Sequence, residues 1–194
     1  MSSFNPKFKP NNQHMRTSMA LNQRKIIIYD DIDENSILEA IYFLNRIKYI
    51  DDKFRKTKDD IEIQINTDGG LVEDGFSLIS LIENMKEEGY NIITTNIGKA
   101  YSMGFLISLC GSIRQSYRYS TYMFHDISYG VYGKHGDIND GVEHANMLRK
   151  NIYSIVTKYT TLTEEDLKDI NEHRKDKFYT PNDMMEIKGV DIIV

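Results

Sequence analysis

The chain has 194 residues, of which 40% are hydrophobic, so its length suits one domain with a sizeable core. Its net charge of -5 and pI near 5.6 argue against a protein that binds nucleic acid through a basic face. The single cysteine, Cys110, excludes an internal disulfide and fits a reducing compartment, so we expect a cytoplasmic protein. No apolar run approaches the roughly 20 residues that span a bilayer, so no membrane partner is expected.

Residues 1–24 differ in composition from the rest of the chain. This segment is polar, contains two of the three prolines, and lacks the apolar stretch of a secretory signal. We expect it to be mobile or removed by processing. The remaining residues, 25–194, are expected to form a single domain.

From residue 25 onward, strand patterns alternate with helix patterns. Short apolar or alternating runs predict strands at 25–32, 61–66 and 90–98, and another within 114–125. Apolar residues at helical spacing predict helices at 34–48, 72–88 and 103–110. Strands and helices that alternate in units of about 30 residues predict right-handed crossovers and an α/β fold with a mainly parallel sheet.

The last third of the chain is mostly helical in pattern. One apolar stripe from about 140 to 160 predicts a long amphipathic helix, which could pack on the core or on another subunit. The capping sequences TEED (163–166) and TPND (180–183) predict the starts of two shorter helices. The closing sequence GVDIIV predicts a final strand.

Two strand-to-helix turns carry residues suited to catalysis. Asp68-Gly69-Gly70 follows one predicted strand, and Ser102-Met103-Gly104 follows the next. In a parallel sheet both turns lie at the carboxyl edge, where ligand sites collect. Glycine turns and helix starts leave backbone N–H groups free to stabilise an oxyanion, which would make Ser102 a candidate nucleophile. Each turn also has a purely structural interpretation, because serine commonly caps helices and paired glycines commonly form turns.

A nucleophilic serine needs a base, and His125 is the candidate. It ends the predicted strand YMFH and would therefore emerge at the same edge of the sheet. The carboxylate that orients its imidazole could be any of many among the 29 acidic residues. The residues alone leave a serine hydrolase and a structural role both open.

Four segments resemble, in order, motifs of the proteolytic subunit of the Clp protease family. INTDGGLVEDGFSLISLI is similar to its glycine-rich segment, and IGKAYSMGFLISLCG is similar to its nucleophile segment. YMFHDISYG resembles the strand that ends in the catalytic histidine, and KDKFYTPNDMMEIKGVDIIV resembles the segment with the catalytic aspartate. The resemblance runs from about Lys25 to the C-terminus and implies a ClpP/crotonase-like fold of stacked βα units, with a protruding handle helix at about 140–160.

The resemblance also implies roles for individual residues. Ser102 would be the nucleophile, His125 the general base and Asp176 its orienting acid, with the backbone N–H groups of Gly70 and Met103 as the oxyanion hole. The implied activity is that of a serine endopeptidase that cleaves unfolded polypeptides inside a chamber of heptameric rings, stacked as a tetradecamer. An AAA+ unfoldase would feed the chamber, and no metal or organic cofactor is implied.

The sequence departs from the family pattern at several places. Asp68 replaces a proline, Asp126 and Ile127 replace a Gln-Pro pair, and Lys175 replaces an arginine that takes part in contacts between rings. The family's N-terminal motif is missing, and an additional charged loop occupies about 51–60. Three alternatives therefore stay open: a viral head-maturation protease that needs no ATPase, a catalytically silent ring subunit, and a crotonase-type acyl-CoA enzyme.

Overall fold

One sheet organises the computed structural model, which describes residues 12–128, 130, 132–173 and 176–194. Its strands are β1 (Lys25–Tyr29), β2 (Ile61–Thr67), β3 (Ile92–Tyr101), β4 (Ile113–Ser116), β5 (Thr121–Phe124), β6 (Lys177–Tyr179) and β7 (Ile192–Ile193). The order is β1-β2-β3-β4-β7, and β5 pairs with both β3 and β6. Only the β5–β6 pairing is antiparallel among these strands, so the predicted α/β fold with a mainly parallel sheet is confirmed.

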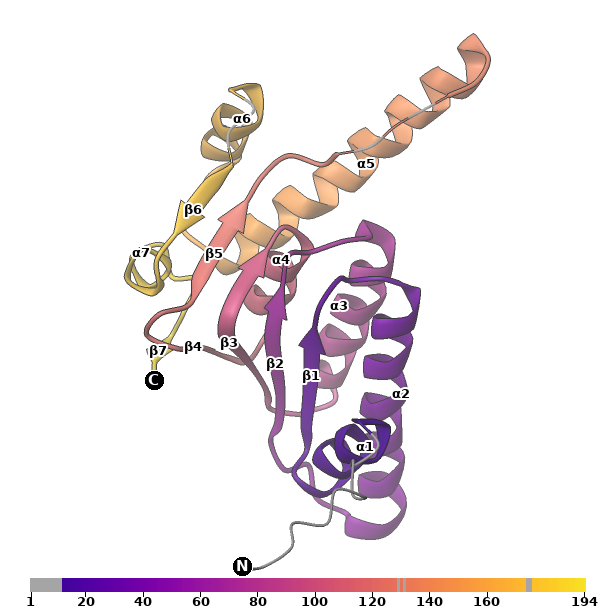
Figure 1. The fold of residues 1–194 in the computed structure, drawn as a ribbon, viewed down its shortest axis with the longest axis vertical. Coiled ribbons are helices and arrows are strands. Elements are labelled where there is room, and N and C mark those ends of the chain that lie inside the picture. The colour runs from indigo at the N-terminus through magenta and orange to yellow at the C-terminus, as the bar shows by residue number, and fades with distance from the viewer. Residues whose placement is uncertain (1–11, 129, 131, 174–175) are drawn as a thin grey trace, which may run out of the picture.

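The helices cover the sheet and extend beyond it (Figure 1). They are α1 (Asn12–Asn22), α2 (Glu34–Ile50), α3 (Val72–Glu87), α4 (Met103–Leu109), α5 (His135–Tyr159), α6 (Glu164–Glu172) and α7 (Pro181–Glu186). A π-helical turn, η1 (Asp51–Arg55), continues α2. Helices α2 and α3 lie side by side along β1 and β2, whereas α5 projects away from the body of the molecule (Figure 1).

The strand pattern follows from alternating burial. In β2 the side chains of Ile61, Ile63 and Ile65 are fully buried, and the residues between them are only half-buried. Alternation of this kind places every second side chain on one face of the sheet. Leu78 and Ile82 of α3 are likewise fully buried, four residues apart on one helix face. The core therefore forms between the sheet and the helices that connect its parallel strands.

Helix α5 matches the predicted long helix, although it begins at His135 rather than near residue 140. Its start is stabilised by Asp137, whose Oδ2 accepts a hydrogen bond of 2.8 Å from the Lys134 N–H. A carboxylate there also interacts favourably with the partial positive charge of the helix start.

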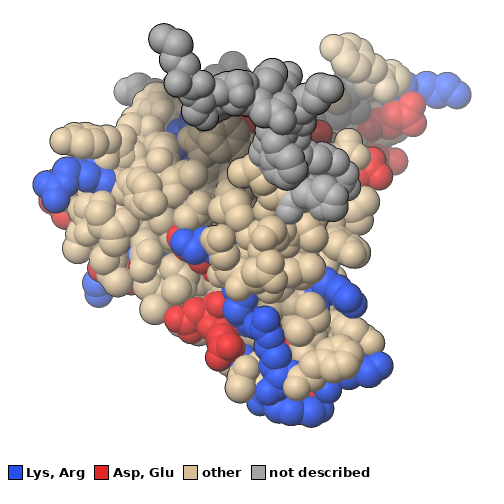
Figure 2. Space-filling model, turned by 60° about the horizontal axis from the view of Figure 1, so that its bottom comes forward, with Lys and Arg blue, Asp and Glu red and all other residues tan. Residues whose placement is uncertain are grey.

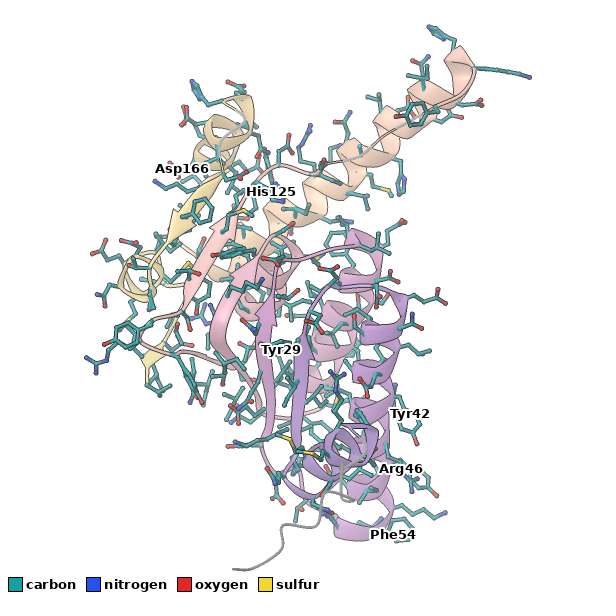
Figure 3. All side chains as sticks on the ribbon, in the orientation of Figure 1. Tyr29, Tyr42, Arg46, Phe54, His125 and Asp166 are labelled. Atoms are coloured by element: carbon teal, nitrogen blue, oxygen red, sulfur yellow. The ribbon has the colours of Figure 1, made fainter. Side chains whose placement is uncertain are left out.

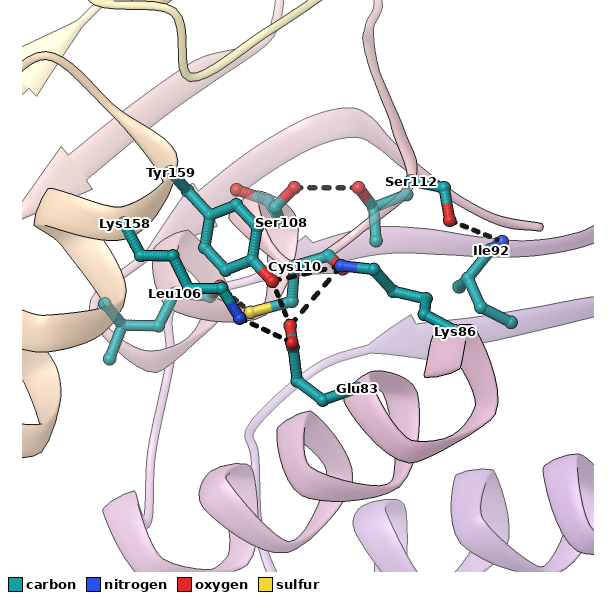
Figure 4. Close-up of polar contacts among 10 residues, drawn as sticks. Glu83, Lys86, Ile92, Leu106, Ser108, Cys110, Ser112, Lys158 and Tyr159 are labelled. Carbon is teal, nitrogen blue, oxygen red and sulfur yellow. Dashed lines mark hydrogen bonds and ion pairs between the residues drawn. The ribbon is translucent and has the colours of Figure 1, made fainter. Parts of the chain in front are cut away.

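The C-terminal end of α5 is anchored to the core by a polar cluster (Figure 4). Lys158 donates to the Glu83 carboxylate of α3 at 2.6 Å, and the Tyr159 hydroxyl donates to the same carboxylate. Lys86 donates to the Cys110 carbonyl at 2.8 Å, which ties α3 to the end of α4. These contacts fix the base of the projecting helix against α3 and α4.

Four short elements were not anticipated, and one of them is η1, within the charged loop expected at about 51–60. Residues 12–22, within the segment expected to be mobile or processed, form α1, in which Ala20 is buried. The strand expected within 114–125 is two strands, β4 and β5, separated by a turn in which the Ser120 N–H donates to the Tyr117 carbonyl. Strand β6 follows Asp176 and carries no strand pattern of its own. Residues 1–11 lie outside the described part of the chain.

The surface carries both signs of charge. On the face drawn in Figure 2, groups of basic side chains alternate with acidic ones and with uncharged surface. None of the helices within the described ranges is both long and apolar enough to cross a membrane.

Candidate active site

Ser102 occupies a strained turn between β3 and α4. Its backbone has φ 53° and ψ −117°, which non-glycine residues rarely adopt. The Ser102 N–H donates to the Met123 carbonyl at 2.9 Å, and the Ser102 carbonyl accepts from the Phe105 N–H at 3.1 Å. The side chain makes no capping hydrogen bond to α4, so the interpretation of Ser102 as an ordinary helix cap is wrong.

His125 reaches Ser102 because β5 runs parallel to β3. Tyr101 is in register with Met123, so the residues that follow these two strands emerge together at the carboxyl edge of the sheet. The Ser102 Oγ lies 2.8 Å from His125 Nε2, a normal hydrogen-bond distance. Figure 3 shows His125 where β5 ends, on the side from which α5 extends.

Asp176 is brought to the same place by β6. Phe124 pairs with Lys177 across the antiparallel β5–β6 ladder, which sets Asp176 beside His125 although 51 residues separate them. The distance from His125 Nδ1 to Asp176 Oδ1 is 3.8 Å, which is within ion-pair range but too long for a hydrogen bond. Catalytic hydrogen bonds are often long before substrate binds, so this distance is compatible with an orienting role.

The glycine turn after β2 packs directly on Ser102. Gly69 has φ +106°, and a Cβ at this position would lie 2.6 Å from Ser102 Cβ and 3.1 Å from the Met103 nitrogen. Hydrogen bonds from Ile32 N–H to the Gly69 carbonyl and from Leu71 N–H to the Ile32 carbonyl hold the turn, each at 2.8 Å. These bonds do not use the Gly70 N–H, and Met103, at the start of α4, has no intrahelical acceptor for its own. Both groups remain candidate oxyanion donors.

A cleft of about 300 Å³ opens at this point. It is lined by Ser102 and His125 together with apolar side chains, which include Val72, Leu106 and Ile152. Three larger clefts, of about 780, 710 and 450 Å³, lie elsewhere, and Ser102 lines none of them. We assign the candidate site by its chemistry rather than by size, because only the smaller cleft holds a hydroxyl bonded to an imidazole. No group of three metal-binding side chains is present within the described residues.

A family model described as Clp protease matches residues 9–194 of this sequence. The chain belongs to the Clp protease family. The resemblance drawn from the four sequence motifs is therefore confirmed. Members of the Clp protease family are serine peptidases and generally assemble as oligomeric rings.

The residues that depart from the Clp protease pattern have partners that the sequence did not reveal. Asp68 forms an ion pair with Lys99 of β3, and the hydrogen bond that the Lys99 ammonium donates to Asp68 raises the pKa of Lys99. Asp126 forms an ion pair with Arg149 of α5 through both carboxylate oxygens, at 3.0 and 3.1 Å. Asp68 and Asp126, which both line the cleft, are thus each paired with a cation. Lys175 lies outside the described residues.

Proposed function

We propose that this chain is a serine endopeptidase in which Ser102 is the nucleophile and His125 the general base. Asp176 would hold the imidazole in the required tautomer, and the N–H groups of Gly70 and Met103 would stabilise the oxyanion. The observation that carries the proposal is the 2.8 Å contact between Ser102 Oγ and His125 Nε2 at a strained strand-to-helix turn.

The proposed reaction proceeds by acyl transfer. His125 Nε2 takes the proton as Ser102 Oγ attacks the peptide carbonyl carbon, and it then delivers that proton to the leaving amine. A water molecule, activated by the same imidazole, hydrolyses the acyl-enzyme and restores the serine. A peptide bound against the apolar side chains of the cleft would displace water from the site, which would strengthen the electrostatic interactions on which both transition states depend.

The proposed setting of this reaction is an oligomeric chamber. Family membership supports a ring assembly, and the projecting α5 offers a long surface for contacts between rings. We propose that unfolded polypeptides are the substrates and that an AAA+ unfoldase supplies them. The proposed chemistry needs no metal or organic cofactor, because the base and the oxyanion donors all come from the protein.

The proposal is tested by hydrolysis of a short fluorogenic peptide, which can diffuse into a chamber without an unfoldase. Ser102→Ala and His125→Ala should each lower kcat by about 10⁶-fold, and Asp176→Asn by about 10⁴-fold. Ser80→Ala is the matched control, because Ser80 is exposed on α3 and its hydroxyl, among the described residues, bonds only to the Phe76 carbonyl of its own helix. Equal rates for the wild type and Ser102→Ala, with both assembled to the same particle mass, would overturn the proposal.

A further inference from the structure

One face of α5 contacts the surroundings of both His125 and Asp176. Arg149 and Tyr153 are four residues apart on this helix and therefore lie on the same side. Arg149 donates from Nε and Nη2 to the two oxygens of Asp126, the residue that directly follows His125. Asp126 Oδ1 also accepts from the Ile127 N–H at 2.8 Å, so the carboxylate fixes the backbone of this short segment.

Tyr153 makes the second contact, toward Asp176. Its hydroxyl accepts a hydrogen bond of 2.6 Å from Nδ2 of Asn171, which lies in α6 five residues before Asp176. Tyr153 is buried, and burial raises its pKa, so the hydroxyl stays neutral at physiological pH. Asn171 Oδ1 is buried and makes no hydrogen bond within the described part of the chain, which leaves Tyr153 as the side-chain partner of this amide.

The strand ladder alone does not hold His125 and Asp176 in place. The last pair of the β5–β6 ladder is Phe124 with Lys177, so both residues lie one position beyond it. Beyond the ladder, Arg149 holds Asp126, which directly follows His125, and Tyr153 holds Asn171 of α6, which ends four residues before Asp176. Both contacts line a single cleft of about 710 Å³ between α5 and α6, which flank the chain leaving β5 (Figure 1).

We infer that Arg149, acting through Asp126, is a positioning residue that sets the distance between the His125 imidazole and the Asp176 carboxylate, while Tyr153 holds α6 to the same helix. This inference rests on the proposed function. The observed 3.8 Å must shorten by about 1 Å to form a hydrogen bond, so small displacements on either side of α5 decide whether it forms. Half-exposed ion pairs contribute little to stability, so the main consequence of the Asp126–Arg149 pair is geometric.

The test compares Arg149→Met, Arg149→Lys and Asp126→Asn with Lys150→Met, which removes a cation that lines the same cleft one residue further along α5. We expect Arg149→Met and Asp126→Asn to lower kcat on the fluorogenic peptide by roughly 10- to 100-fold, because catalysis is sensitive to misplacement of about 1 Å. The KM of Arg149→Met should change less than about twofold, because Arg149 does not line the cleft that holds Ser102, whereas Asp126 does. Arg149→Lys should recover part of the loss, because it keeps the charge without the bidentate geometry.

Two further results separate positioning from general destabilisation. The double variant Arg149→Met with Asp126→Asn should be no slower than the slower single variant, because the two residues act as one unit. The particle mass and thermal midpoint of Arg149→Met and Asp126→Asn should match those of Lys150→Met. If Arg149→Met does not assemble, the kcat of Arg149→Lys is compared with that of Lys150→Met instead. If wild-type activity depends on Ser102 but the kcat of Arg149→Met lies within twofold of that of Lys150→Met, this inference alone is overturned. Absence of Ser102-dependent hydrolysis in the wild type would overturn the proposed function as well.

Discussion

Replacing Gly69 by alanine tests whether the glycine turn positions the nucleophile. Both Gly69 and Gly89 have positive φ, +106° and +93°, so an alanine at either position takes on a similar backbone penalty. They differ in their surroundings, because a Cβ at Gly69 would lie 2.6 Å from Ser102 Cβ and 2.8 Å from the Tyr101 carbonyl oxygen. A Cβ at Gly89 would meet no atom within 4 Å. Gly89→Ala is therefore the matched control.

The magnitude follows from these two terms. An L-residue with left-handed backbone costs about 1–2 kcal/mol, which both variants share. At Gly69 the new methyl group must also displace backbone that is fixed by the Ser102–Met123 hydrogen bond, and overpacking of this kind costs about 1–3 kcal/mol more. For a chain of this length 1 kcal/mol corresponds to about 2–4 °C in thermal midpoint. Gly69→Ala should therefore melt roughly 2–12 °C below Gly89→Ala.

Activity provides the second measurement. Displacement of Ser102 by a few tenths of an ångström to 1 Å should lower kcat on the fluorogenic peptide by roughly 10- to 100-fold in Gly69→Ala. Gly89→Ala should keep the wild-type kcat, because Gly89 lies before the start of β3, whereas Ser102 follows the other end of that strand. Both variants are compared at equal protein concentration, since assembly shifts the melting temperature. Equal midpoints and equal kcat values for the two variants would show that the turn does not constrain Ser102.

Three further predictions concern stability, each measured by urea unfolding. Arg24→Met should lower the free energy of unfolding by about 3–5 kcal/mol, because it leaves the Asp51 carboxylate buried without its cation. Adding Asp51→Leu should recover most of the lost stability. A loss under 1 kcal/mol in Arg24→Met alone contradicts the prediction. Phe105→Ala should cost about 3–5 kcal/mol, since the ring is fully buried; a loss typical of a surface site would mean the core relaxes around it. Hydrogen bonds from the Thr180 N–H and hydroxyl lower the pKa of Asp183 below 3.8 in the folded protein. The ionised carboxylate therefore stabilises the fold at a pH above 3.8, and this stabilisation is lost as the pH falls through the folded-state pKa. Asp183→Asn should therefore be less stable than the wild type at pH 6, and the difference in stability should narrow as the pH falls below 3.8; a constant difference refutes the assignment.

The elements that could be predicted from sequence are those with a strong local pattern. The alternation in β2 and the caps at Thr163 and Thr180 each depend on residues close together in the chain, and the structure confirms them. The position of His125 at the sheet edge followed from its place at the end of a strand. The proximity of His125 to Ser102 needed the parallel register of β3 with β5, which no local pattern specifies.

What could not be predicted depends on contacts between distant segments. Strand β6 has three residues, too few to show alternation, yet its pairing with β5 brings Asp176 to His125. Only the family resemblance singled out Asp176 among the acidic residues. The Asp126–Arg149 pair forms only if the face of α5 that carries Arg149 turns toward the end of β5. The apolar stripe of α5 shows which face is buried, but it does not show against which part of the fold that face packs. Helix α1 has a weak apolar pattern, so its packing on β1 and α2 left no clear signal.

The geometry of Ser102 is a consequence of the packing behind it. All seven residues of α4 are buried, so this short helix has no polar face, and its position is set by the core rather than by a side-chain cap. The close approach is made possible by glycine, since a Cβ at Gly104 would lie 2.4 Å from Thr67 Cγ2, and one at Gly75 would lie 2.2 Å from Met103 Cγ. Because the core holds α4, the strained Ser102 backbone can persist without using its own hydroxyl as a cap. The Oγ is left free to bond His125, so substitutions in the core beneath α4 should change kcat even where no substrate contact is altered.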